Sequence, residues 1–441
     1  MKPSLFCDLL AGKGHQSLTV AALFARRLRR GFLLACCCCL AAAAQSSNPV
    51  QDLVEAARAG SSRFVELVKK EMPRGGVQVW GQDFLFVNAS ESPVTISIDD
   101  QPAVPMQAVT GTNLWYRLDK MRTGVTHSHQ SFAAGKGLGA RGDVPGLNPD
   151  SYPKAGVARG VLSEKQTITS TTYPGMKLDF WYYASPGVNP AVAAPLMVWQ
   201  DGQGLIDRER SQMRLFTVTE NLIAQELIPP MVHILIAPGF VDKTAMRAVE
   251  YDTVSEKYPR FLIEEIFPLV EKAYKLRADG YSRAIAGGSS GAICAFNAAW
   301  FFPEKFTRVH STIGSYTSIK WHVPENSDGG NAYPFKVRKE PKRNIRVWMS
   351  DGVDDLENEH GSWPLQNIQL ANSLKMKGYD YHYRLGTAAH NGSQASLDLP
   401  ESLAWLWRGY DGGKTEQVFE QDASEKDKPM YRVKLLNRDA W

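Results

Sequence analysis

A glycine-flanked serine between an apolar strand and a helix constrains this chain more than any other feature. The stretch Arg283–Gly287 has the composition of a buried strand, and residues 290–302 have that of a helix. The turn between them contains Gly287-Gly288-Ser289-Ser290-Gly291, the pattern G-x-S-x-G. In this context the pattern predicts a nucleophile elbow, a strained turn that lifts a serine hydroxyl to the carboxyl edge of a parallel sheet.

Ser289 is therefore the expected nucleophile. Ser290 is the competing one, but the residue two places after it is Ala292 rather than glycine, so it fits the pattern less well. The alternative without chemistry is a plain glycine-rich turn, because G-x-S-x-G by itself also occurs by chance.

A serine hydroxyl needs a base to remove its proton and an acid to orient that base. After an elbow these follow in the order acid, then histidine. His390 lies in a loop after the last predicted strand and is our choice of base, with His360 as the leading alternative. Four acids compete after the strand at 345–350; we choose Asp355, then Asp354, then Glu357.

Stabilisation of an oxyanion requires backbone N–H groups near the nucleophile. The first is expected at Ser290, at the start of the helix after the elbow. The second is expected near Gly202, in the loop that follows the strand at 196–200. A plain turn at Gly202 is the alternative.

The hydrophobic pattern divides the chain into regions of different period. Residues 50–72 have helical spacing, and period-two strands from 76 to 132 predict a small β-sandwich. From about residue 165, buried strands alternate with helices, which predicts a doubly wound α/β sheet. We expect a signal at 1–44, a short helix plus β-sandwich at 50–132, a Gly/Pro-rich linker at 133–160, a catalytic domain at 161–411 and a tail at 412–441.

The N-terminal region has the pattern of an export signal. Arginines precede the apolar run Gly31–Ala44, which small residues close at 41–44. Arg29-Arg30-Gly31-Phe32-Leu33 also resembles the twin-arginine form. The 14-residue run is shorter than the roughly 20 residues that a transmembrane helix needs, so we expect a periplasmic or secreted protein with no membrane span after cleavage.

Charge and composition narrow the classes of partner. Residues 1–44 hold six Lys or Arg and one acid, a net charge of +5, so of the chain's +4 the remainder carries −1. Nothing in this charge suggests a nucleic-acid surface, which would need a clustered basic patch, so we expect no nucleic-acid partner. Cys294 is the single cysteine after the signal, so no disulfide is expected within a mature monomer. His127 and His129 could bind a metal, but no third ligand is evident, and we expect neither a metal nor a cofactor.

Five stretches of residues 165–410 resemble the enterochelin-esterase-like branch of the esterase D family, within the α/β-hydrolases. They are Val198–Gln203, Arg247–Tyr251, Ala286–Gly291, Gly352–Asp355 and Gly386–His390. The resemblance places the family's nucleophile, base and acid on Ser289, His390 and Asp355. Relatives commonly have two glycines after the elbow, where this chain has Gly291 and Ala292. Residues 76–132 look like the early-set immunoglobulin-like domain that often precedes such catalytic domains.

The resemblance implies a serine carboxylesterase. Members cleave catecholate siderophore esters, or feruloyl and acetyl esters on plant polysaccharides. With export in mind we expect a small-molecule or glycan-linked ester of the second kind, and a siderophore ester as the alternative. Two other classes stay open: a non-catalytic carbohydrate-binding protein on a hydrolase fold, and metal-assisted hydrolysis around His127 and His129. The sequence does not determine the oligomeric state.

Overall fold

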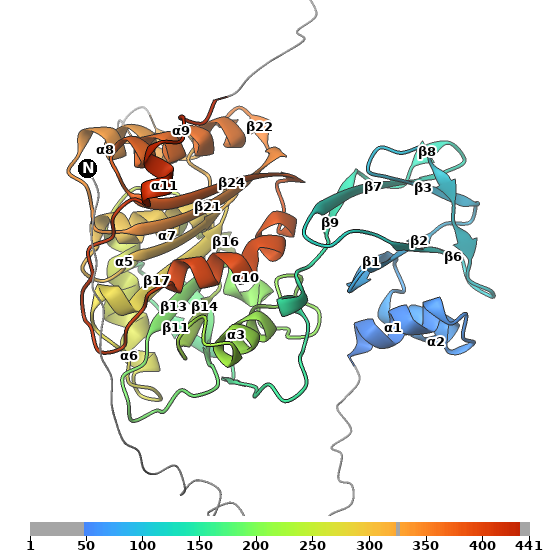
Figure 1. Cartoon of the computed structure of the whole chain (residues 1–441), viewed down its shortest axis with the longest axis horizontal. Coiled ribbons are helices and arrows are strands. Elements are labelled where there is room, and N and C mark those ends of the chain that lie inside the picture. The colour runs from blue at the N-terminus through green and yellow to red at the C-terminus, as the bar shows by residue number, and fades with distance from the viewer. Residues whose placement is uncertain (1–47, 323–326, 433–441) are drawn as a thin grey trace, which may run out of the picture. The chain divides into compact units, whose positions relative to one another are not determined.

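The computed structural model describes residues 48–322 and 327–432 (Figure 1). The predicted export signal at 1–44 lies outside these residues. The helical spacing at 50–72 produces a broken pair of helices, α1 (Pro49–Arg58) and α2 (Arg63–Glu71). The break falls at Gly60, whose φ of +59° is one that glycine adopts without strain. Leu53 and Val68 are buried against the first sheet of the molecule.

The period-two segment forms two antiparallel sheets that pack face to face. The first has the order β1-β2-β6-β5, and the second has the order β4-β3-β7-β8 with β9 also paired to β7. Phe84 and Phe86 of the first sheet and Val94 and Ile96 of the second share one buried cluster. The strands are β1 (Gly76–Trp80), β2 (Asp83–Ala89), β3 (Val94–Ile98), β4 (Val104–Pro105), β5 (Gln107–Ala108), β6 (Leu114–Lys120), β7 (Thr126–Ala133), β8 (Lys136–Gly137) and β9 (Gly142–Pro145).

The β region extends beyond the bound at residue 132 that the sequence predicts. Strands β8 and β9 lie inside the stretch 133–160, which we expected to be a linker. These strands are short and lie among many glycines, so their sequence shows no alternation of apolar and polar residues. In the structure, β9 nevertheless pairs with β7 in register, with Val144 opposite His127. The rest of the stretch is tied down as well, because the Asn221 amide donates to the carbonyls of Asp150 and Tyr152, each at 2.8 Å.

A mostly parallel sheet follows, in the order β16-β15-β12-β14-β13-β17-β18-β21-β24. The six strands from β14 to β24 in that order are parallel to one another, whereas β12 is antiparallel to β14. Their near-continuous apolar composition reflects cover on both faces. The strands are β10 (Val161–Leu162), β11 (Gln166–Thr169), β12 (Lys177–Ala184), β13 (Leu196–Gln200), β14 (Val232–Ile236), β15 (Phe240–Val241), β16 (Thr244–Ala245), β17 (Arg283–Gly288), β18 (Arg308–Thr312), β21 (Arg346–Asp354) and β24 (Asp380–Ala389).

Helices cover both faces of this sheet, as the doubly wound pattern predicts (Figure 1). One face carries α3 (Leu215–Ala224) and α10 (Ser393–Trp407), whose residues Leu215 and Leu399 share a buried cluster with Trp199 of β13. The helices whose apolar residues join the cluster on the other face are α5 (Lys257–Phe261), α6 (Phe267–Val270), α7 (Ser290–Phe301), α8 (Tyr333–Lys339) and α9 (Trp363–Met376).

Short elements complete the described chain. A π-helical turn, η3 (Leu262–Ile266), joins α5 to α6, so residues 257–270 form one continuous but irregular helical element. The remaining pieces are η1 (Pro149–Ser151), η2 (Gly202–Gly204), α4 (Arg247–Tyr251), η4 (Gly280–Ser282), β19 (Trp321–His322), β20 (Ser327–Asp328), η5 (Gly329–Ala332), β22 (Glu357–Asn358), β23 (Gly361–Ser362) and α11 (Ala423–Lys426).

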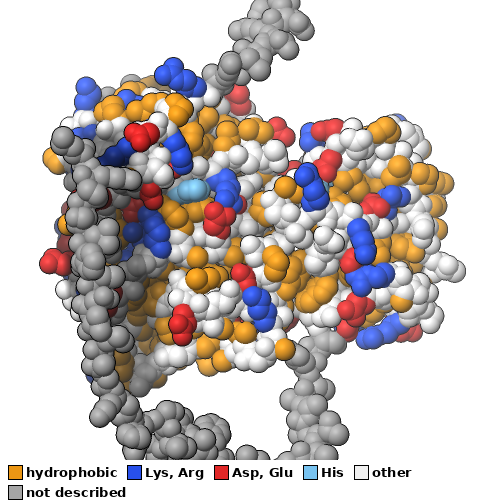
Figure 2. All heavy atoms as spheres, in the orientation of Figure 1, with side chains coloured by type: hydrophobic (Ala, Val, Ile, Leu, Met, Phe, Trp, Pro, Cys, Tyr) orange, Lys and Arg blue, Asp and Glu red, His pale blue; other side chains and the backbone are white. Residues whose placement is uncertain are grey.

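Two surface properties bear on the predicted partners. Within the described ranges, none of the helices is long and apolar enough to cross a membrane. On the face drawn in Figure 2, Lys and Arg side chains lie interspersed with Asp and Glu, and neither sign gathers into a large patch.

Candidate active site

The turn at Ser289 has the strained geometry that the sequence predicts for an elbow. Ser289 joins the end of β17 to the start of α7 with φ 58° and ψ −124°, a conformation that is costly for a residue with a side chain. A Cβ atom on Gly287 would lie 2.3 Å from the backbone of Gly291. A Cβ atom on Gly291 would lie 3.0 Å from Cβ of Gln200. Close backbone approach therefore requires glycine at 287, and at 291 a side chain would crowd that of Gln200.

The structure brings together the serine, histidine and acid that the sequence selects. His390 Nε2 lies 2.8 Å from Ser289 Oγ, and His390 Nδ1 lies 2.5 Å from Asp355 Oδ1. The three side chains come from the loops after β17, β21 and β24, which meet at the carboxyl edge of the sheet. Such a chain can carry a proton from the serine to the imidazole while a carboxylate stabilises the resulting cation.

Burial distinguishes the competing acids. The Asp355 side chain is fully buried, whereas Asp354 and Glu357 are exposed. Burial opposes ionisation of Asp355, but hydrogen bonds from His390 and Asp351 hold its pKa below its ordinary value. Burial, and then the Asp355 carboxyl group, hold the pKa of Asp351 well above its usual range. Burial therefore favours the protonated form of Asp351 beside the Asp355 carboxylate.

His360, the other candidate base, lies elsewhere. Its backbone carbonyl accepts hydrogen bonds from Ser318, and its ring lies 3.7 Å from Glu359 on the surface. His127 is also engaged away from this site. It is buried, its Nδ1 lies 2.7 Å from Asp99 and its Nε2 lies 3.0 Å from the Arg122 carbonyl.

Two further side chains contact the serine and histidine. Ser315 Oγ lies 3.2 Å from Ser289 Oγ and accepts a hydrogen bond from Trp363 Nε1 at 3.1 Å. The Trp363 ring packs edge-on against His390, with ring centroids 5.5 Å apart. No sequence pattern pointed to Ser315, since it lies in an irregular loop after β18. Trp363 is buried, yet one edge of it supports the site.

The two predicted oxyanion donors begin different helical elements, one inside the elbow and one after β13. Ser290 is the first residue of α7, where a backbone N–H has no acceptor within the helix. Gly202 begins η2, and a Cβ atom there would lie 2.5 Å from the backbone of β14. The preceding residue, Asp201, reaches the elbow, because a Cβ atom on Gly291 would lie 3.2 Å from its Oδ2.

An arginine neutralises the Asp201 carboxylate beside the elbow. Arg247 Nε and Nη2 donate to the two Asp201 oxygens, each at 2.8 Å. Although burial opposes its charge, these bonds raise the pKa of Arg247. Glu250 follows on the same short helix and accepts from Gly239 N at 2.8 Å, and burial raises its pKa to about 7. The Arg247–Asp201 pair joins the segments 198–203 and 247–251 beside the elbow.

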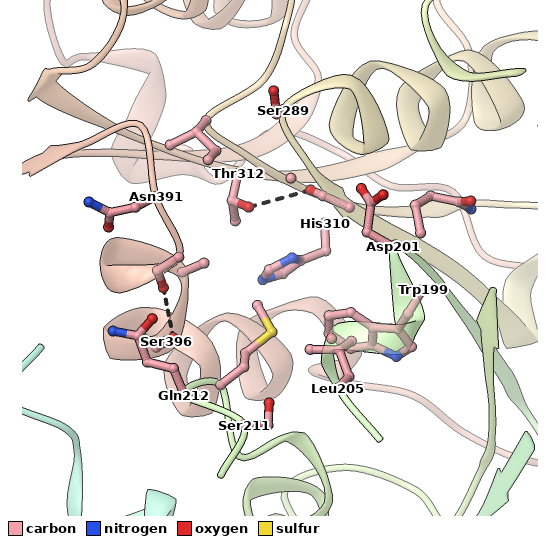
Figure 3. A pocket seen from close by; sticks show the side chains of 18 of the residues that line it. Trp199, Asp201, Leu205, Ser211, Gln212, Ser289, His310, Thr312, Asn391 and Ser396 are labelled. Carbon is pink, nitrogen blue, oxygen red and sulfur yellow. Dashed lines mark hydrogen bonds between the residues drawn. The ribbon is translucent and has the colours of Figure 1, made fainter. Parts of the chain in front are cut away.

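A cavity of about 470 Å³ opens beside Ser289 (Figure 3). Its charged lining residues are Asp201 and Arg247, which pair with each other. None of the other lining residues is Asp, Glu, Lys or Arg. The apolar ones are Trp199, Leu205, Met213, Ile313 and Ala395, and the polar ones include Ser211, Gln212, Thr312, Asn391 and Ser396. This cavity fits the uncharged acyl or aryl part of a small molecule.

Comparisons with known proteins agree with this geometry. The model of the Esterase family, described as "Putative esterase", matches residues 175–406, more than half of the chain. No curated protein sequence matches the chain at a significant level.

Solved structures show the same fold. An enterobactin esterase from Shigella flexneri, solved in the presence of 2,3-dihydroxy-N-benzoyl-glycine, is 17% identical with a TM-score of 0.54, over 79% of this chain and 99% of that chain. A ferric enterobactin esterase from Salmonella typhimurium is 16% identical with a TM-score of 0.51, over 78% and 98%. The chain belongs to the Esterase family and is a carboxylic ester hydrolase with a mixed α/β fold.

Proposed function

We propose that this hydrolase is a serine esterase in which Ser289, His390 and Asp355 form the catalytic triad. The observation that carries the proposal is the continuous chain of contacts, 2.8 Å and 2.5 Å long, that starts at a serine held in a strained elbow. A binding protein on the same fold would have no need for that strain, which functional sites retain at a cost of about 1–3 kcal/mol.

The steps follow from this arrangement. Ser289 Oγ attacks the ester carbonyl carbon while His390 Nε2 takes the serine proton, and Asp355 stabilises the imidazolium. The backbone N–H groups of Ser290 and Gly202 face the oxyanion that forms. The C–O bond to the alcohol then breaks, and His390 returns its proton to the departing alkoxide. Water, deprotonated by His390, hydrolyses the acyl-enzyme and releases the carboxylic acid.

The cavity favours an uncharged acyl group. Trp199, Leu205 and Met213 offer an apolar surface near Ser289, and the one charged pair in the lining is internally neutralised. Feruloyl, acetyl and related aryl esters, free or linked to a glycan, fit these properties. A trianionic iron–catecholate complex would need unpaired cations beside it, and Arg247 is committed to Asp201.

Hydrolysis of an enterobactin-type lactone is the second candidate. It is favoured by the fold likeness to enterobactin esterases, nearly the whole length of which this chain covers. The iron-free lactone carries catechol groups without the charge of the iron complex, so it agrees better with the neutral cavity than the ferric form does.

We also propose export through the signal at residues 1–44. The arginines and the apolar run that follows them support this proposal. The mature protein recovered from outside the cytoplasm should begin close to Gln45 by mass spectrometry, and an intact residue 1 on the exported protein would contradict it.

The experiment compares the wild-type protein with Ser289→Ala. Both are assayed with p-nitrophenyl acetate, methyl ferulate, and an enterobactin-type tricatecholate lactone with and without iron. We expect kcat to fall about 10³-fold or more in the variant, because no acyl-enzyme forms. The ester with the highest kcat/KM identifies the substrate class. Wild-type turnover in Ser289→Ala would overturn the triad, and a wild-type protein that hydrolyses none of the esters would overturn the substrate proposal.

A further inference from the structure

The described residues from Pro49 onward belong to one compact unit, and within it the N-terminal β region contacts the loop that carries His390. The contact comes from β9, the strand that sequence reasoning assigned to a linker. Its Asp143 side chain leaves the sandwich and accepts hydrogen bonds from two residues of that loop. No step of the proposed chemistry uses this carboxylate.

The two hydrogen bonds flank the histidine. Asp143 Oδ2 accepts from the backbone N–H of Ala389 at 2.7 Å and from the side-chain amide of Asn391 at 2.9 Å. The Asp143 carbonyl is also 3.4 Å from the hydroxyl of Ser393, the first residue of α10. One carboxylate thus holds the residues immediately before and after His390.

The held segment is a tight turn with His390 at its centre. Asn391 N donates to the Ala389 carbonyl at 2.7 Å, a three-residue turn that narrows the conformations open to His390. The Asn391 side-chain oxygen accepts from Ser393 N at 2.9 Å and joins the turn to α10. Asp143 bonds to both ends of the turn, so it restrains the direction in which the imidazole leaves the backbone.

The turn needs such restraint because the base must meet two partners at once. His390 reaches Ser289 with one nitrogen and Asp355 with the other, and its ring is about one-fifth exposed. A catalytic group must be held within about 0.5 Å of its productive position, and a displacement of about 1 Å costs on the order of 100-fold in rate. Asp355 fixes the far end of the ring, and Asp143 fixes the backbone from which the ring projects.

We propose that Asp143 is a positioning residue for His390, through which the N-terminal β region takes part in ester hydrolysis. This inference rests on the proposed function, because it assigns Asp143 a role through the proposed base. The β region is then part of the catalytic apparatus, whatever else it binds.

The test compares four variants of the whole protein, each with a single substitution. Asp143→Ala removes both hydrogen bonds, and Asp143→Asn keeps one neutral acceptor oxygen. Asp119→Ala is the matched control, because Asp119 is a strand carboxylate of the same β region that pairs with Arg117 at 2.5 Å. Ser289→Ala reports separately on the triad. The readouts are kcat and KM with p-nitrophenyl acetate, the pH dependence of kcat and the thermal midpoint.

We expect Asp143→Ala to lower kcat about 10- to 100-fold with KM within about threefold, and Asp143→Asn to recover much of the loss. The pH profile of kcat should change in Asp143→Ala, because the turn no longer holds His390 against both Ser289 and Asp355. Asp119→Ala should keep wild-type kcat and pH profile even if its thermal midpoint falls.

Two results would overturn the inference. One is a wild-type kcat and pH profile in Asp143→Ala. The other is a loss of kcat that has the same relation to the fall in thermal midpoint in Asp143→Ala as in Asp119→Ala. Failure of the triad would be recognised separately, by activity in Ser289→Ala. An inactive Ser289→Ala beside a fully active Asp143→Ala would leave the proposed function intact and refute only the role of Asp143.

Discussion

The turn that holds Ser289 and the turn that holds His390 reach their geometry by opposite means. Ser289 is held by its own neighbours, because β17 and α7 adjoin it directly and Gly287 and Gly291 allow the close approach. His390 is held by residues distant in sequence. Asp355 lies 35 positions away, and Asp143 lies 246 positions from Ala389.

The difference shows which parts of an active site a short motif can encode. The nucleophile depends on backbone sterics within one strand-turn-helix unit, so a five-residue pattern is enough to find it. The base sits in a loop whose conformation is set by hydrogen bonds that arrive from elsewhere in the chain. Substitutions at the Ser289 turn therefore test local backbone sterics, and substitutions around the His390 turn test hydrogen bonds from distant parts of the chain.

The largest loss of kcat is expected when the carboxylate of Asp355, the hydrogen-bond partner of His390 Nδ1, is replaced. Asp355→Asn keeps the shape of the side chain but removes the charge that stabilises the His390 imidazolium and selects its tautomer. We expect kcat to fall on the order of 10³–10⁴-fold with KM little changed. Steady-state kinetics with p-nitrophenyl acetate measure this, with Asp354→Asn as the exposed neighbouring control. Equal losses in both variants would contradict the choice of acid.

The next effect tests the local turn. Gly287→Ala places a methyl group 2.3 Å from the backbone of Gly291, so the elbow must open. We expect about 100-fold lower kcat and a loss of about 1–3 kcal/mol in the free energy of unfolding. Gly412→Ala serves as the control, because its Cβ atom would meet nothing within 4 Å. Urea unfolding and kinetics decide the outcome, and an unaltered Gly287→Ala would show that the turn tolerates a side chain.

A smaller effect is expected at Ser315, a neighbour supplied by the tertiary fold. Ser315→Ala removes the hydroxyl that lies 3.2 Å from Ser289 Oγ and accepts from Trp363. We expect a loss in kcat of roughly 3- to 10-fold, the value of one neutral hydrogen bond of about 1 kcal/mol. Trp363→Phe breaks the same network from the other end. If the two increases in activation free energy, calculated from kcat, add in the double variant, the residues act independently and the network is refuted.

The smallest effect on catalysis is expected from a substitution of Glu250, which changes the pH dependence of the free energy of unfolding instead. Burial raises the pKa of Glu250 from 4.5 to about 7, so the folded state binds this proton more tightly than the unfolded chain. The stability it contributes is full below about pH 4.5 and is lost as the pH rises through 7. Glu250→Gln stays neutral and can still accept from Gly239 N.

Above pH 7 we therefore expect the Glu250→Gln variant to gain up to about 3 kcal/mol relative to the wild type, with kcat near the wild-type value. The difference between the two curves of unfolding free energy against pH, from pH 4 to 9, measures this gain. Parallel curves would mean that Glu250 has an ordinary pKa in the folded protein.

Much of the fold follows from the sequence. The near-continuous apolar strands and the helices between them predict a sheet covered on both faces, and the structure has such a sheet with helices on each face. The exception is the stretch 133–160. Strand β9 has four residues, too few to show the period of two that identifies a strand in sequence. It is a strand because it forms backbone pairs with β7.

The sequence by itself determined the elbow, the order of strands and helices, and a short set of residues from which Ser289, His390 and Asp355 could be chosen. Those properties depend on local sterics and on hydrophobic period, which neighbouring residues encode. The tertiary structure decided that Asp355 is buried while Asp354 is exposed, that Ser315 and Trp363 support the site, and that Asp143 reaches the turn of His390. These contacts join residues far apart in the chain, and such pairs exist only once the sheet has brought its loops together.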